Sequence, residues 1–390
     1  MKIEQRKWTS SLGWTPAHPG NFAGSVQLVF VFGAAAILRH PRTSAAIRND
    51  YPNAIVFGCS TSGEICGTDV SDDSLVATAV HFQYTQLRRA QVNVPSMAAS
   101  FPAGEQIGKQ LPAALHNAAT GNDERLVHVL TLTDGLKVNG SEFVAGLVKQ
   151  LPRGVAVTGG MAGDGVRFGE TLVYRDSMAE SGAIAAIGLY GPRLKVGFGS
   201  LGGWDVFGTE RLVTGSKSNV LYELDGVPAL ALYKEFLGEG AARGLPATGL
   251  LFPLSIRTNE DEPPVVRTIL SVDEDTQSIT FAGDIPEGSY ACLMKANFER
   301  LIDGATGAAQ ICHEALQSSA PDLALLISCV GRRLVLKERS DVEVKAVRDV
   351  LGGTATLAGF YSYGEISPFT PGARCELHNQ TMTITTLTER

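Results

Sequence analysis

Three stretches of the chain share one pattern, and they decide the expected fold: AIVFGCSTSGEI at residues 54–65, VAVTGGMAGDGV at residues 155–166 and ATLAGFYSYGEI at residues 355–366. Each begins as an apolar run and ends in a glycine followed by an acid, namely Glu64, Asp164 or Glu365. Glycine tolerates positive φ and has no side chain, so a strand that ends in such a bend brings N–H groups and a carboxylate close to a ligand. We interpret the three stretches as equivalent corners of a repeat.

Each corner belongs to a larger unit. An apolar strand and a helical segment precede it, beginning with QLVFVFG at 27–33, RLVHVLTL at 125–132 and LALLISC at 323–329. Another apolar strand follows it, at residues 75–80, 183–189 and 381–387. This strand-helix-strand-strand order predicts a mixed α/β fold, in which duplicated units form mixed sheets covered by helices. The detailed arrangement that we expect is an αββα sandwich.

The bulk composition narrows the function classes. The chain has 390 residues, a net charge of −7 and scattered Lys and Arg, which argues against a nucleic-acid surface. Its longest apolar run, Val26 to Leu38, is too short to span a bilayer, and the N-terminus has no signal-peptide pattern. The six cysteines form no disulfide framework. These features predict a cytoplasmic protein without membrane or nucleic-acid partners.

The chain divides into a short leading segment and two domains. Residues 1–24 are rich in turn residues and precede the first unit. Residues 25–238 and 239–390 are the expected domains, and the Gly/Ala-rich segment 238–244 is the expected hinge between them. The segment 104–119 has helical spacing, with Pro112 at a kink or a new turn.

Several of these segments resemble the FIST family. GCSTSGEI (58–65), DGLKVNGSEFVAGL (134–147) and GGMAGDG (159–165) are similar to a FIST N-terminal domain. SCVGRRLVLKER (328–339), LAGFYSYGEISPF (357–369) and LHNQTMTITTL (377–387) are similar to a FIST C-terminal domain. The resemblance covers residues 25 to 388, and its order and spacing are more specific than any one motif.

The resemblance implies a sensory protein that binds a small polar ligand, such as an amino acid, without transforming it. The chain has no kinase, cyclase or receiver motif, so the output would lie in a partner such as a histidine kinase or a diguanylate cyclase/phosphodiesterase. An alternative implied by the family is a haem-binding nitric oxide sensor. No separate cofactor is expected otherwise.

Two corners supply most of the candidate ligand-binding residues. Hydroxyls and amides can bind a polar ligand, and Tyr side chains can form its apolar walls. These candidates are Cys59, Ser60, Thr61, Ser62, Glu64, Tyr361, Tyr363 and Glu365. Asp164 completes the set of corner carboxylates, one of which could hold an ammonium group. For the first corner, the alternative is a tight turn in which Glu64 caps a neighbouring backbone. For the last corner, the alternative is a strand with one Tyr facing inward and the other outward. Corner acids that bind no ligand could cap turns.

Further candidates lie outside the corners. Arg332 occupies the position of the family's GR motif and could pair with a ligand carboxylate; a salt bridge is the alternative. Asp134 and Asn139 follow a strand end and suit either a turn or a ligand. His378 and Asn379 match the family's HN motif, where His378 could bind the ligand, cap a loop or hold a haem iron.

Catalysis and metal binding receive less support. A Cys-dependent hydrolase would use Cys59 as nucleophile, but no His follows at a hydrolase spacing. The chain has neither a CxxC pair nor an HExxH motif, and no phosphate-binding loop. The sequence therefore predicts a non-enzymatic sensor without a metal site.

Overall fold

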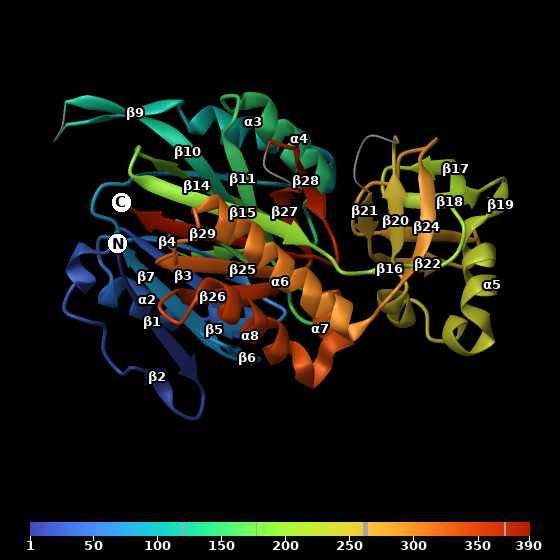
Figure 1. Cartoon of the computed structure of the whole chain (residues 1–390), viewed down its shortest axis with the longest axis horizontal. Helices are drawn as coiled ribbons and strands as arrows, with labels where there is room; N and C mark the ends of the chain where they lie inside the picture. The colour runs from blue at the N-terminus through green and yellow to red at the C-terminus, as the bar shows by residue number, and fades with distance from the viewer. Residues whose placement is uncertain (119–120, 177, 260–263, 370–371) are drawn as a thin grey trace.

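The chain folds into a large lobe and a small lobe (Figure 1). The computed structural model describes residues 1–118, 121–176, 178–259, 264–369 and 372–390. The large lobe contains sheets of seven, seven and six strands, and the small lobe contains one sheet of nine. The mixed α/β class expected from the sequence is confirmed.

Three repeated units form the large lobe. In each, a central strand pairs in parallel with the strand that carries the corner, and antiparallel with a third strand. In the first unit, β3 (Leu28–Gly33) pairs in this way with β4 (Ile55–Ser60) and β7 (Leu75–His81). The second unit has β10 (Asn122–Thr133) with β11 (Ala156–Met161) and β14 (Ala183–Tyr190), and the third has β25 (Leu323–Cys329) with β26 (Thr356–Ser362) and β29 (Met382–Glu389). β3, β25 and the second half of β10 are almost continuous apolar runs because both of their faces are covered.

A helix connects each parallel pair, as a parallel connection requires. These helices are α2 (Pro41–Asp50), α4 (Gly140–Gln150) and α8 (Ser340–Leu351). A second helix, α3 (Ser100–Gln110) or α6 (Phe298–Ala315), packs beside α4 or α8. The helix expected over 104–119 is shorter, since α3 ends two residues before Pro112 and β9 (Ala114–Asn117) follows.

The units exchange strands around a pseudo-threefold axis. The strand after each corner leaves its own sheet and joins the next: β5 (Glu64–Cys66) pairs with β26, β27 (Gly364–Pro368) with β11, and β12 (Val173–Arg175) with β4. A second exchange pairs β8 (Gln86–Asn93) with β14, β15 (Leu194–Leu201) with β29, and β1 (Lys2–Thr9) with β7. The leading segment 1–24 therefore supplies β1 and β2 (Gly13–Thr15) to a sheet. The short strands β6 (Asp69–Ser71), β13 (Met178–Glu180) and β28 (Cys375–His378) lie at sheet edges.

One hydrophobic core joins the inner faces of all three sheets. Phe32, Leu132 and Ile327 contribute to it from different sheets. The rings of Phe32 and Phe360 lie 4.7 Å apart, across two of them. The helices cover the outer faces, as Figure 1 shows for α3, α4, α6 and α8. The expected two-sheet αββα sandwich is thus replaced by three sheets around one core, because every unit gives strands to its neighbours.

The small lobe is an insertion between β15 and α6. It contains β16 (Asp205–Val206), β17 (Arg211–Lys217), β18 (Val220–Leu224), β19 (Val227–Pro228), α5 (Ala229–Ala242), β20 (Leu254–Arg257), β21 (Val265–Arg267), β22 (Ile269–Asp273), β23 (Ser278–Phe281) and β24 (Tyr290–Lys295). The chain passes between the lobes at residues 202–204 and 296–297. The segment 238–244 is not this connection, since it lies at the end of α5, where Gly238 has φ 72° and kinks the helix.

Candidate functional site

The three corners meet on the pseudo-threefold axis. The N–H of Ser62 donates to Tyr361 O at 2.8 Å, that of Gly163 to Ser60 O at 2.9 Å, and that of Tyr363 to Met161 O at 3.2 Å. Each corner therefore bonds to the next in a closed ring. The structure brings the corners together, as a shared site would require, but backbone hydrogen bonds occupy the point where they meet.

The register corrects the assumed equivalence of the three acids. Gly58, Gly159 and Gly359 are equivalent, because a Cβ atom on each would lie within 1.9 Å of a carbonyl oxygen of the central strand. Six residues further on stand Glu64, Gly165 and Glu365. Asp164 is thus one position early, which the glycine-acid pattern alone could not reveal.

The carboxylates of Glu64 and Glu365 have protein partners. Glu64 accepts from the Thr61 hydroxyl at 2.5 Å, from the Ser74 N–H at 3.2 Å and from the Ser74 hydroxyl at 2.6 Å. Glu365 accepts in the same way from Ser362 and Thr381. Glu64 therefore holds the start of β7 in place, and Glu365 holds the start of β29. Burial raises the pKa of Glu64 to about 7 and that of Glu365 to about 8, against the donors that favour the charged form.

In the second unit, Asp134 takes over this role. Its Oδ1 accepts from the Thr171 hydroxyl at 2.7 Å, and its Oδ2 accepts from the Gly182 N–H at 2.6 Å and from the Ser181 hydroxyl at 3.1 Å. Asp164 instead closes its own turn, accepting from three N–H groups between Phe168 and Glu170. The hydroxyl of Tyr363 also donates to Asp164. The turn weighed as the alternative therefore describes the bonds of Asp164 to residues 168–170. Glu64, Glu365 and Asp134 instead bond to N–H groups and hydroxyls that lie further along the chain.

Arg332 and Tyr361 belong to a buried polar cluster. The Arg332 guanidinium donates to Glu343 Oε1, from Nε at 2.8 Å, and to the carbonyls of Gly202 and Leu301. The Tyr361 hydroxyl donates to Glu343 Oε2 at 3.1 Å. Gly202 lies in the first interlobe crossing and Leu301 in α6, just after the second, so Arg332 holds the two connections together at the base of the small lobe.

The other candidates of the first corner, Ser60, Ser62 and Cys59, are also enclosed. Ser60 and Ser62 accept from the N–H groups of Leu172 and Gly165 through their hydroxyls. Cys59 lies in the central core, where burial raises the pKa of its thiol well above the usual value. A ligand contact for these residues stays a prediction that their geometry does not favour.

His378 and Asn379 lie in the same enclosed region. The Nε2 atom of His378 bonds to Ser367 O at 2.9 Å, and burial lowers the pKa of the ring to about 4. Asn379 donates to Tyr363 O, while its Oδ1 has no partner among the described residues. The ring is enclosed and its Nε2 is engaged, so His378 does not fit an axial haem ligand as it stands.

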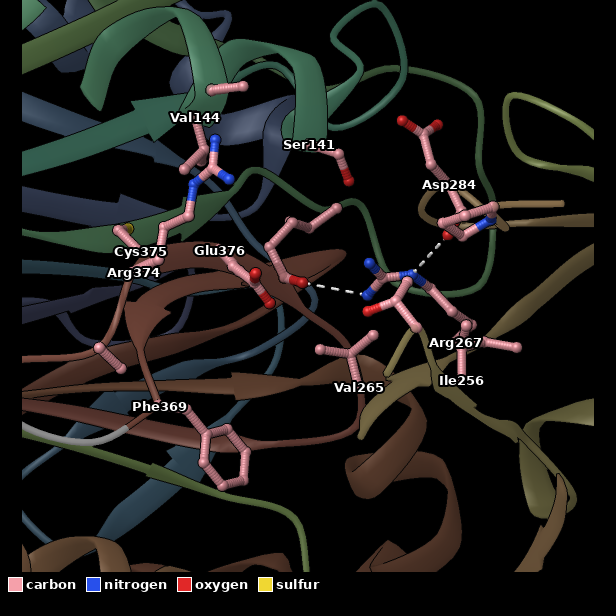
Figure 2. Close-up of a pocket in the computed structure, with 15 residues that line it drawn as sticks. Ser141, Val144, Ile256, Val265, Arg267, Asp284, Phe369, Arg374, Cys375 and Glu376 are labelled. Atoms are coloured by element: carbon pink, nitrogen blue, oxygen red, sulfur yellow. Dashed lines mark hydrogen bonds between the residues drawn. The ribbon is translucent and has the colours of Figure 1, made fainter. Parts of the chain in front are cut away.

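A cavity of ≈ 410 Å³ lies between the lobes, close to β28 (Figure 2). Its large-lobe wall comes from the start of α4 and from β28, and its small-lobe wall from β20, β21 and the loop after β23. Four charged side chains line it: Arg267, Asp284, Arg374 and Glu376. This is a concave site with few polar groups on a largely apolar wall, the usual form of a small-molecule site.

Arg267 crosses the floor of this cavity. It donates from Nε to Asp284 O at 3.1 Å and from Nη1 to Leu377 O at 3.0 Å, so it ties the small lobe to β28. No hydrogen bond joins its Nη2 to a described residue. Burial lowers its pKa to about 10, which leaves it charged at neutral pH.

Ser141 faces the guanidinium from the opposite wall. It lies in the first turn of α4, and its hydroxyl is buried without a partner among the described residues. Figure 2 shows its side chain pointing from the end of the helix toward the cavity. A helix N-terminus also favours an anion, because its first N–H groups are unpaired and its dipole is positive there.

Sequence reasoning placed only one residue beside this cavity. Asn139 caps α4 by accepting from Glu142 N, and its Nδ2 donates to Asp284 Oδ1 at 3.0 Å, across the two lobes. Arg267, Ser141 and Asp284 were missed. No periodicity or motif marks them, because they become neighbours only where the inserted lobe meets α4.

Neither a metal-ligating cluster nor a membrane-spanning helix is present among the described residues. No group of three or more His, Cys, Asp or Glu side chains could hold a metal ion. No helix within the described ranges is long and apolar enough to cross a membrane.

The chain is similar to several known proteins. Uncharacterized proteins from Mycobacterium bovis and Mycobacterium tuberculosis are 29% identical over 241 residues, which cover 58% of this chain and 59% of theirs. A second uncharacterized protein of Mycobacterium tuberculosis is 28% identical over 252 residues, covering 61% of this chain and 63% of its own. The chain thus matches less than two thirds of these relatives' length.

A solved structure aligns with the full chain. The crystal structure of a cyanuric acid hydrolase from A. caulinodans covers 100% of this chain at 8% identity, with a TM-score of 0.39. This similarity is too low to support an argument. The family models are decisive, because the FIST N domain matches residues 27–227 and the FIST C domain matches residues 229–368. The chain therefore belongs to the FIST family.

Proposed function

We propose that this protein is a sensory protein that binds a small polar ligand in the interlobe cavity and does not transform it. The observation that carries the proposal is that one cavity is lined by the Arg267 guanidinium from the small lobe and, from the large lobe, by the Ser141 hydroxyl, which has no partner among the described residues. The family resemblance supports a sensory role. The site differs from the corner loops first considered, whose polar groups already have protein partners.

The charges of the cavity favour a carboxylate ligand. Arg267 Nη2 and the Ser141 hydroxyl are donors without a partner among the described residues, and they suit one carboxylate beside the positive end of the α4 dipole. Asp284 and Glu376 are acids on the same lining and suit an ammonium group. An amino acid carries both groups, so it is the ligand class that we propose.

The two lobes supply a means of signalling. The ligand would contact both walls, and so would bind more tightly when the lobes are held together. Hydrogen bonds of Arg267 and Asn139 join the lobes at the cavity. A change in lobe position would alter a surface read by a separate cytoplasmic partner, such as a histidine kinase or a cyclic-di-GMP enzyme.

Two other functions have less support. Haem binding would need an accessible axial ligand, and His378 is enclosed with its Nε2 bonded to Ser367 O. A Cys59-dependent hydrolase would need a thiolate near a base. Cys59 instead lies in the core, where burial raises the pKa of its thiol. We therefore propose neither a cofactor nor catalysis.

Isothermal titration calorimetry with a panel of the common amino acids tests the proposal. Ser141→Ala and Arg267→Gln should each weaken binding of the best ligand, the latter about tenfold or more, since a hydrogen bond to a charged group is lost. Arg211→Gln, which removes an exposed pair with Asp225, is the matched control and should bind normally. If Ser141→Ala and Arg267→Gln both keep the parent affinity while remaining folded, the site is wrong.

A further inference from the structure

A second hollow lies on the outer face of the sheet formed by the first unit. Its volume is ≈ 390 Å³, and Trp8 of β1 and Trp14 of β2 line one side. The two Trp residues are opposite each other in the β1–β2 hairpin. The other side comes from α2 and the one-turn helix α1 (Ala35–Leu38) before it. We call this hollow the Trp groove.

The other two sheets of the large lobe have a helix at the corresponding place. On the sheet of the second unit, α3 packs against α4 and β8. On the sheet of the third unit, α6 packs against α8 and β15. The strand exchange makes β1 the equivalent of β8 and β15. After β1 the chain instead forms β2 and a single 3-10 turn, Ala23–Ser25, so the Trp groove is where the third such helix would lie.

The surface of α2 resembles the helix-binding surface of α4. A Cβ atom on Gly146 would lie 2.1 Å from Phe101 O of α3, and one on Gly104 of α3 would lie 2.2 Å from Phe143 O. On α4, the contact between the two helices thus involves Phe143 and Gly146, which are three positions apart. On α2, Thr43 and Ala46 have the same separation and line the Trp groove. Ala46 is small enough to allow a similarly close approach.

The charges of the groove indicate the nature of its occupant. Arg42 lines it, is exposed and forms no ion pair with a described residue. None of the described residues that line the groove is an acid. Beneath α3, by comparison, Lys149 of α4 pairs at 2.9 Å with Glu105 of the covering helix. The covering helix supplies the acid there, and the helix beneath supplies the cation.

We propose that the Trp groove binds an amphipathic α-helix of a partner protein, with its apolar face on Trp8 and Trp14 and an acidic residue beside Arg42. This inference does not depend on the proposed ligand or on the interlobe cavity. The helix would complete the outer layer that the chain builds for itself on its other two sheets. Helix-in-groove recognition of this kind depends on apolar anchors along one helical face.

Tryptophan fluorescence can test the proposal directly. The chain has three Trp residues, and the third, Trp204, lies buried elsewhere, so a Trp204→Phe background leaves only those of the groove. The probe is a lactam-bridged helical peptide of about four turns, since short free helices are marginal in water. It carries a Leu/Ala face and a flanking Glu, and a second peptide replaces that Glu by Lys.

The Glu peptide should shift the Trp emission saturably to shorter wavelength, and the Lys peptide should bind about threefold more weakly, as an exposed ion pair allows. Arg42→Glu should reverse the preference. Ala46→Phe, which adds no Trp emission, should abolish binding by filling the groove, whereas Ala45→Phe, on an exposed residue outside the lining, should not. Circular dichroism of every variant checks its fold.

Three outcomes would overturn the proposal. The first is no saturable shift with either peptide in the folded Trp204→Phe protein. The second is binding that Ala46→Phe and Ala45→Phe affect equally. The third is a dimer in sedimentation that Ala46→Phe alone converts to a monomer, which would make a second copy of this chain the occupant.

Discussion

Arg332 and Glu343 form an ion pair in which neither side chain has any exposed surface. Removing one partner leaves a buried, unpaired charge, which costs about 3–5 kcal/mol. We expect Glu343→Gln to lower the free energy of unfolding by at least the lower figure, as measured by urea denaturation. The double variant Arg332→Met/Glu343→Leu should be more stable than Glu343→Gln. If Glu343→Gln unfolds at the same urea concentration as the parent, the pair contributes no net stability.

The raised pKa of Glu365 gives stability a specific pH dependence. The carboxyl group holds its proton in the folded state up to about pH 8, whereas its ordinary pKa is 4.5. Between these values the folded state binds more protons, so stability falls as pH rises from 4.5 to 8. Glu365→Gln, which is neutral throughout, should reduce this fall by about 1 kcal/mol or more in urea titrations at pH 5 and pH 8. An unchanged slope would mean that Glu365 is ionised in the native protein.

Cysteine reactivity should follow burial. Cys66 is the one partly exposed thiol of the six, and the other five are buried. In the native protein at neutral pH, we expect iodoacetamide to modify Cys66 first, and Cys59 only on unfolding. Peptide mass spectrometry of timed samples measures the order, and Cys66→Ser should remove the early product. Fast modification of Cys59 would revive the hydrolase alternative.

Gly359 allows β25 and β26 to lie side by side. A Cβ atom there would meet Leu326 O at 1.8 Å, and backbone cannot move aside cheaply. Gly359→Ala should therefore destabilise the protein by about 1–3 kcal/mol or prevent folding. Gly353→Ala is the matched control, since a Cβ atom at Gly353 meets nothing within 4 Å. Equal thermal midpoints for the two variants would contradict this packing.

The repeat was readable from sequence because its signals are local. Apolar strands, crossover helices and glycine corners each have their own pattern, so three units and their element order were predicted. The pairing of strands from different units was not predicted, because it depends on the direction that the chain takes after each corner. No periodicity in the sequence indicates that β5, β12 and β27 pair with strands of another unit. For this reason the structure has three sheets where a two-sheet sandwich was expected.

The same distinction applies to the site. Glycine next to an acid marked Glu64 and Glu365 as unusual, and they are buried with raised pKa values, but their partners Ser74 and Thr381 lie many residues away. Arg267 could not be found from sequence, since its surroundings arise from the contact between the inserted lobe and β28. Asn139 was found because an Asn-Gly pair after a strand end has a local signature, although the structure shows that it caps α4.

The exchange of strands has a consequence for how the chain can be divided. A cut between residues 228 and 229 would separate β5 and β15 from β26 and β29, and β11 from β27. Each fragment would then expose unpaired sheet edges, which promote aggregation. Neither family segment can therefore serve as an independent module, although the two fragments, produced together, carry every complementary edge needed to reassemble by fragment complementation.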